Sequence, residues 1–168
     1  LLQVGEQVLF ESSVIVEYLD ESYGDSLHPG NPLTRAQNRS WMEFGNECLM
    51  NGFNLIVQPD AEGFHAQRVA MTAKLEQLES QLSGSHFFNG DTVSLVDLSF
   101  APFFQRLGFI NDVSPGLIDE NSHPKVYRWA RNLLSLDIIQ ASTVPEIKQL
   151  YTGMMKKRNG YLSTLMVD

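Results

Sequence analysis

Positions 90–101 read Gly90-Asp91-Thr92-Val93-Ser94-Leu95-Val96-Asp97-Leu98-Ser99-Phe100-Ala101, and this stretch contains the local signals that start a buried helix. The Ser94 hydroxyl can accept from the backbone N–H of Asp97, while the Asp97 carboxylate can accept from the N–H of Ser94. This structural capping box satisfies N–H groups that a helix start leaves without partners. Apolar side chains follow on almost every face, so we expect other helices to surround this one.

Composition predicts a globular protein of the cytoplasm. Of the 168 residues, 43% are hydrophobic, yet no apolar run approaches the roughly 18 residues of a membrane span. No secretory signal is recognisable, so we expect no membrane partner. Cys48 is the single cysteine, which fits a reducing compartment. Its apolar, helical surroundings favour a buried core residue over a catalytic thiol.

Charge and histidine spacing exclude two other classes of site. The formal net charge is −8, and the one basic run is 156–158, so nucleic-acid binding is not expected. We interpret that run as compensation of a helix dipole. The four histidines are far apart in sequence and have no carboxylate or thiolate at ligand spacing, so we expect no metal and no bound cofactor.

The first 19 residues predict two strands and a helix. Two apolar runs, at 1–4 and 7–10, flank the turn Gly5-Glu6, which is typical of a hairpin. Apolar residues then recur at helical spacing up to Leu19, with Glu11 or Ser12 in the cap region. On this pattern alone, Ser12 is a capping residue.

The remainder predicts a mainly α protein. Glycine and proline interrupt the segment 20–33, after which Asn31 can cap a helix with Pro32 at its first position. Further helices are expected at 69–82, ending at Ser83-Gly84, at 94 onward with a kink at Pro102, and from Pro124. The expected inward side chains of the 69–82 helix are Val69, Met71, Leu75, Leu78 and Leu82. A short helix at 136–141, a last helix opened by Pro145 and a packed tail at 161–165 complete the set.

Three motifs together resemble the cytosolic glutathione S-transferase family, in its bacterial-type form. They are Leu9-Phe10-Glu11-Ser12-Ser13-Val14-Ile15-Val16-Glu17-Tyr18-Leu19, the capping box, and the tryptophan-containing helices with Arg35-Ala36 to Trp41 and Pro124 to Trp129. The resemblance implies a glutathione transferase C-terminal-like helical bundle, residues 34–168. It also implies a linker at 24–33, preceded at 1–23 by a ββα remnant of a thioredoxin-like domain.

The resemblance implies a role for the start of the first helix. In the family, an acidic residue followed by serine holds the γ-glutamyl end of glutathione, and Glu11 and Ser12 match these positions. A hydroxyl and free N–H groups suit a carboxylate, and Glu11 could receive the ammonium group. The family conjugates the glutathione thiol, a co-substrate, to a hydrophobic electrophile.

One departure from the family limits the expected activity. In the family, the thiol-activating residue and the cis-proline come before the strand that the segment starting at Leu1 resembles. No catalytic residue is therefore expected in this chain. We therefore expect impaired conjugation. The alternative is a non-catalytic binding or scaffold module of the same fold.

Two kinds of surface are expected from the same resemblance. Glu43, Glu47 and Asn51 are predicted to line the cleft beside the thioredoxin-like part. Two long helices would form the family's dimer surface, and the uncharged edge at 1–4 predicts homo-oligomer contacts that include residues 1–19.

Overall fold

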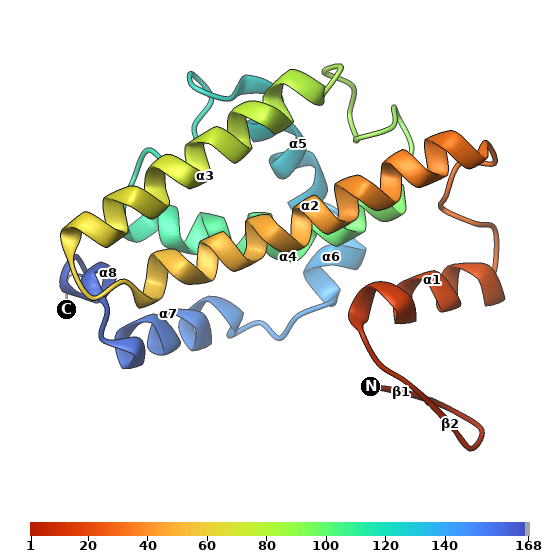
Figure 1. Ribbon diagram of the computed structural model, residues 1–168, viewed down its shortest axis with the longest axis horizontal. Helices are drawn as coiled ribbons and strands as arrows, with labels where there is room; N and C mark the ends of the chain where they lie inside the picture. Colours follow the sequence, from red (N-terminus) through yellow and green to blue (C-terminus); the bar gives the residue numbers. More distant parts are fainter. Residues whose placement is uncertain (167–168) are drawn as a thin grey trace.

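The computed structural model describes residues 1–166, which form a two-stranded antiparallel sheet followed by eight helices (Figure 1). The strands are β1 (Leu2–Val4) and β2 (Gln7–Leu9), with Leu2 opposite Leu9. The helices are α1 (Ser12–Ser22), α2 (Pro32–Val57), α3 (Ala61–Gln81), α4 (Leu95–Val113), α5 (Pro124–Leu134), α6 (Asp137–Ala141), α7 (Ile147–Arg158) and α8 (Tyr161–Thr164). The predicted mainly α fold and the hairpin are confirmed.

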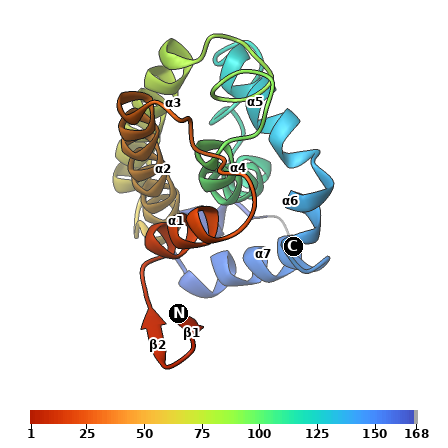
Figure 2. The ribbon, with the colours of Figure 1, turned by 90° about the vertical axis from the view of Figure 1, so that its right-hand side faces the viewer.

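Helix α4 occupies the centre of the bundle, as its sequence predicts. Figure 2 shows α2 and α3 on one side of it, with α5, α6 and α7 around the rest. Its most deeply buried aromatic residues are Phe100, Phe103 and Phe104, each at most 2% exposed. Burying one side chain of this size contributes about 1.5–3 kcal/mol, so the helix is a major source of stability.

The carboxylate of Asp97 joins three parts of the chain. Its Oδ2 accepts from the backbone N–H of Ser94 at 2.8 Å and from the Ser94 hydroxyl at 2.6 Å. Its Oδ1 accepts from the N–H of Phe88 at 2.9 Å and from Trp129 Nε1 at 2.6 Å. The predicted capping box is therefore present, and it also fixes the preceding loop and α5.

Helix α2 begins as its sequence predicts. The Asn31 side chain accepts from the N–H groups of Leu33 at 2.9 Å and Thr34 at 3.1 Å, and Pro32 is the first helical residue. The hairpin turn uses Gly5 at φ 60°, a conformation that glycine adopts without steric cost. Local sequence therefore determines both the start of α2 and the turn of the hairpin.

One predicted core position in α3 is wrong. Val69 was expected to face the core but is 71% exposed, whereas Phe64, five residues earlier, is 1% exposed. The buried face of α3 contains Phe64, Met71, Leu75 and Leu78, which follow the helical period. Val69 lies two residues before Met71, and two residues correspond to about 200° around a helix, so it points away.

The C-terminal segment packs on the bundle. Helix α7 begins at Ile147, two residues after the predicted opening at Pro145. Leu162 in α8 is fully buried, and the N–H of Tyr161 donates to the carbonyl of Gln58 at 2.6 Å. The tail therefore folds over the end of α2, as expected.

Candidate functional site

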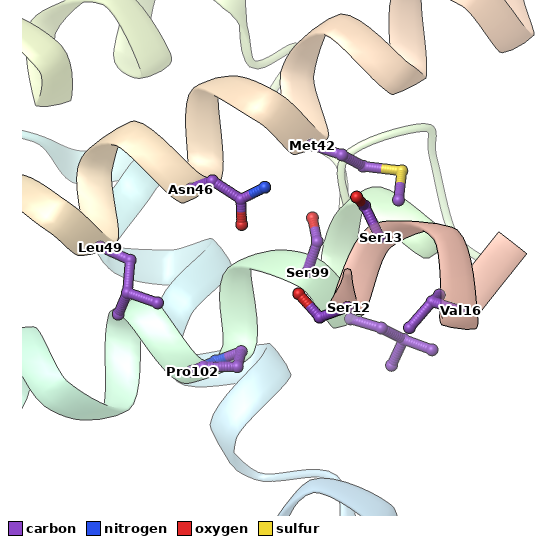
Figure 3. A pocket seen from close by; sticks show the side chains of 9 residues that line it. Ser12, Ser13, Val16, Met42, Asn46, Leu49, Ser99 and Pro102 are labelled. Atoms are coloured by element: carbon purple, nitrogen blue, oxygen red, sulfur yellow. The ribbon is translucent and has the colours of Figure 1, made fainter. Parts of the chain in front are cut away.

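A cavity of about 250 Å³ lies between α1, α2 and α4 (Figure 3). We call it the α1 cavity. Its lining combines five apolar side chains with three serines and one asparagine. The residues are Ser12, Ser13, Val16, Met42, Asn46, Leu49, Leu98, Ser99 and Pro102.

Polar side chains from all three helices reach this cavity. Figure 3 shows Ser12 from α1, Asn46 from α2 and Ser99 from α4 directed toward the space between the helices. The Ser99 hydroxyl donates to the carbonyl of Val96 at 2.7 Å, so its lone pairs remain able to accept from a ligand. The cavity therefore offers hydrogen-bonding groups against apolar walls, the usual composition of a small-molecule site.

The predicted binding residues Glu11 and Ser12 lie together at the start of α1. Glu11 takes the N-cap position, and Ser12 is the first helical residue. The first hydrogen bond of the helix runs from the N–H of Ile15 to the carbonyl of Glu11, at 3.0 Å. The N–H groups of Ser12, Ser13 and Val14 therefore have no acceptor within α1, and they suit an anion.

Glu11 has an unusual backbone conformation. Its φ is 68° and its ψ is 121°, a combination that costs a non-glycine residue about 1–3 kcal/mol. The side chain is exposed, and it does not line the cavity, whereas Ser12 does. The structure thus brings Ser12 to the cavity and leaves Glu11 at its edge.

The predicted cleft residues on α2 require a correction. Glu47 and Asn51 line a polar groove between α2 and α3 instead, and Glu43 lines this groove as well as a recess beside α1. In that groove, Glu47 pairs with Lys74 at 2.9 Å, and Asn51 donates to Gln67 at 2.8 Å.

The reason for this error is the helical phase of α2. The residues that reach the α1 cavity are Met42, Asn46 and Leu49. Glu43 and Glu47 each follow one of them by one position, which rotates them by about 100° around the helix. Only Glu43 also borders α1, where it lines a second, more open recess.

Cys48 is a core residue, as expected. Its side chain is fully buried, and burial raises the pKa of its thiol to about 12. A thiol with this pKa stays protonated near neutral pH, so it is not a nucleophile.

Sequence reasoning missed a charged cluster beside the α1 cavity, formed by Glu17, His28 and Arg39. Arg39 Nε donates to Glu17 Oε1 at 2.9 Å, and Arg39 NH2 donates to Glu17 Oε2. His28 Nε2 lies 2.9 Å from Glu17 Oε1. Chiefly because of the Arg39 hydrogen bonds, the pKa of the Glu17 carboxyl group is lowered to about 2. No local spacing indicates this cluster, because its members come from α1, the linker and α2.

Two further kinds of feature concern residues 1–166, namely metal sites and membrane-spanning helices. In this range no group of three or more His, Cys, Asp or Glu side chains is arranged to hold a metal ion. No helix within the same range combines the length and apolar character that crossing a membrane requires.

The arrangement of helices is that of a known protein class. The sequence profile described as "Glutathione S-transferase, C-terminal domain" matches residues 39–137. A Tau class glutathione S-transferase from mango, Mangifera indica, superimposes with a TM-score of 0.73 at 21% identity, covering 88% of this chain and 71% of that one. A rice GST1 in complex with glutathione gives 0.72 at 23%, covering 89% and 71%.

Curated relatives point to the same class. "Glutathione transferase GST 23" of Zea mays is 31% identical over 159 residues, covering 91% of this chain and 70% of that protein. "Glutathione S-transferase U1" of Arabidopsis thaliana is 30% identical over 153 residues, covering 87% and 66%. The chain therefore belongs to the glutathione S-transferase family. These relatives are plant proteins, so the expected bacterial-type form is not supported.

Proposed function

We propose that this chain binds glutathione at the start of α1 and holds a small apolar electrophile in the α1 cavity, as the ligand-binding part of a conjugating transferase. The observation that carries the proposal is the position of Ser12. This residue both lines the cavity and belongs to the helix turn with unpaired N–H groups. A ligand held by that turn would therefore extend toward the cavity.

The γ-glutamyl end of glutathione has a carboxylate and an ammonium group, and the start of α1 suits both. The N–H groups of Ser12 and Ser13 and the Ser12 hydroxyl can donate to the carboxylate. The positive end of the helix dipole favours that anion by about 0.3–1 kcal/mol. The exposed Glu11 carboxylate can accept from the ammonium group.

The cavity limits the second substrate. More than half of its lining side chains are apolar, and none of its nine lining residues ionises near neutral pH. A charged ligand would lose its hydration there without gaining an opposite charge. A compact, uncharged electrophile fits best.

The position of Ser12 is equally consistent with a second candidate function, a non-catalytic binding module. Conjugation requires a group that stabilises the glutathione thiolate, and the buried Cys48 thiol cannot assist. In this alternative the chain binds glutathione without turning it over. For either candidate we propose a cytoplasmic location, in keeping with the relatives.

A homo-oligomer is part of the proposal. Met50 and Val69 are 58% and 71% exposed on α2 and α3, the pair of long helices expected to form a dimer. Val8 and Phe10 on and after β2 are 55% and 66% exposed, which supports additional contacts through residues 1–19. Light scattering on Val69→Glu and Val8→Glu variants distinguishes the two surfaces. A new charge should reduce the oligomeric state only where it lies in a subunit contact.

Calorimetric titration with glutathione tests the binding proposal. Ser12→Ala removes the hydroxyl and should weaken binding by about 10- to 150-fold, because one hydrogen bond to a charged group is worth about 1.5–3 kcal/mol. Ser80→Ala, at an exposed serine of α3 whose hydroxyl donates to the carbonyl of Gln77 and which does not line the cavity, serves as the matched control and should leave binding unchanged. Equal affinity of the Ser12 variant and the parent would contradict the proposal. A conjugation assay on the same samples then separates the enzyme from the binding module.

A further inference from the structure

Helix α1 is attached to the bundle mainly by polar side chains. None of its residues is buried, and Val16 is the residue of α1 that packs against the core cluster. Figure 1 shows α1 and the hairpin beside the end of the bundle rather than within it. Weak apolar burial gives little resistance to local detachment, so other contacts must set the orientation of this helix.

The strongest of these contacts is the cluster of Glu17, His28 and Arg39, which we call the Arg39 clamp. Both carboxylate oxygens of Glu17 accept from the Arg39 guanidinium, in the paired geometry that restricts orientation most. His28 adds a third contact to Oε1 at 2.9 Å, and its side chain is only 2% exposed. The clamp therefore joins α1, the linker and α2 at one point.

The linker is itself folded so that His28 reaches Glu17. Asp20, three residues after Glu17, accepts from the Ser26 hydroxyl at 2.6 Å and from the N–H of Leu27 at 2.7 Å. The Ser26 hydroxyl in turn accepts from the N–H of His28 at 3.1 Å. The clamp is thus supported by a second set of hydrogen bonds on the same helix.

The clamp adjoins the α1 cavity along α2. Ser13 and Met42 line that cavity, and they also line the recess that contains Glu17 and Arg39. Arg39, Met42 and Asn46 follow one another at three- and four-residue spacing, so they share a face of α2. Asn46 lies seven positions after Arg39, a rise of about 10 Å along the helix, which places the clamp one to two turns from the cavity lining.

We infer that Glu17, His28 and Arg39 are positioning residues, which orient α1 so that Ser12 and the free N–H groups face the α1 cavity. The inference rests on the proposed binding of glutathione at the start of α1. The three side chains do not contact the ligand. They hold the site in its binding orientation, so that binding does not have to order α1.

Three variants and a matched control test the clamp. Arg39→Gln and Glu17→Gln each remove a charge while keeping a polar side chain, and Arg39→Lys keeps the charge but loses the paired geometry. Lys148→Gln is the control, because Lys148 forms an exposed ion pair with Asp112, at 2.7 Å, elsewhere on the bundle. Each protein is measured by calorimetric titration with glutathione and by hydrogen exchange of the α1 and α5 amides.

The expected result is a dissociation constant raised at least about ten-fold in Arg39→Gln and Glu17→Gln, with partial recovery in Arg39→Lys. The double variant Glu17→Gln/Arg39→Gln should bind no more weakly than either single variant, because both remove the same contact. Amides of α1 should exchange faster in these variants while amides of α5 do not change. The control should match the parent in both measurements.

Each other outcome overturns the inference. If the parent binds glutathione and Arg39→Gln binds equally well, the clamp is not a positioning device, while the proposed function stands. If α5 amides also exchange faster, the affinity loss reflects general destabilisation and the inference fails. If the parent does not bind glutathione, the proposed function fails first and the inference fails with it.

Discussion

The carboxylate of Glu79, on α3, caps the start of α5 by accepting from the backbone N–H of Val126 at 2.9 Å. Both of its oxygens also lie 3.0 Å from the N–H of Lys125. Helix α5 has no cap of its own, because the His123 side chain at the N-cap makes no capping hydrogen bond and Pro124 has no N–H. A side chain from another helix therefore supplies the partner that local sequence does not.

Replacing Glu79 should therefore destabilise the fold. We expect Glu79→Ala to lower the free energy of unfolding by about 1–3 kcal/mol, because it leaves part-buried donors without an acceptor. Glu76→Ala is the matched control, since Glu76 is an exposed residue one turn earlier on α3. Denaturant unfolding of both variants gives the comparison, and equal midpoints would show that the cap contributes nothing.

Asp97 should be the more sensitive carboxylate. It is fully buried and accepts from Ser94, Phe88 and Trp129. Asp97→Ala strands these donors, so we expect a loss of about 3 kcal/mol or more, whereas Trp129→Phe removes one bond and part of the packing and should cost about 1–3 kcal/mol. Asp91→Ala, at an exposed loop position, is the control. A midpoint for Asp97→Ala close to that of the control would contradict the central role of this side chain.

The features that the sequence predicts correctly are those whose partners are close along the chain. The Asn31 cap, the Gly5 turn and the Ser94–Asp97 box each involve residues no more than four positions apart. Spacing of this kind is visible in the sequence, because helix and turn geometry determine which neighbours meet. Glu11 and Ser12 are also adjacent in the chain, but their role in binding glutathione stays a prediction.

The interactions that sequence reasoning missed are long-range. Trp129 is 32 residues from Asp97, Arg39 is 22 residues from Glu17, and Val126 is 47 residues from Glu79. Their meeting depends on how helices cross, which periodicity does not specify. The error at Glu47 and Asn51 has a related cause. A 26-residue helix contacts different neighbours on different faces, and polarity alone does not say which face meets α1.

Two glycines in the C-terminal region should respond oppositely to alanine. A Cβ on Gly160 would lie 2.2 Å from the carbonyl oxygen of Ile56 and 2.9 Å from that of Gln58, so the α2–α8 contact would have to open. We expect Gly160→Ala to cost about 1–3 kcal/mol. Gly153, inside α7, has open space around it, and Gly153→Ala should stabilise by about 0.5–1 kcal/mol because alanine favours helix. Thermal unfolding measures both, and shifts of the same sign would refute the packing described for α8.

The Arg39 clamp predicts how the attachment of α1 depends on pH. Hydrogen bonds from Arg39, together with His28, lower the pKa of the Glu17 carboxyl group to about 2. The pKa of a glutamate in an unfolded chain is about 4.3. A folded-state pKa below the unfolded value means that the charged carboxylate stabilises the folded state at pH values above the unfolded pKa. This contribution decreases as the pH falls from about 4.3 toward 2, where protonation of Glu17 releases the clamp.

Hydrogen exchange of α1 amides, measured against pH and corrected for intrinsic exchange rates, tests this dependence. At pH 7 the parent should protect α1 better than Glu17→Gln does, because the variant lacks the charge that Arg39 binds. The difference should persist to about pH 4.5, shrink as the pH falls toward 2, and vanish only below about pH 2, where most of the folded protein has a protonated Glu17. Arg39 keeps its charge throughout this range, so its guanidinium does not contribute to the change. A parent-minus-variant difference that stays constant from pH 7 to pH 2 would show that α1 is held by contacts other than the Glu17 charge, such as the packing of Val16 on the core.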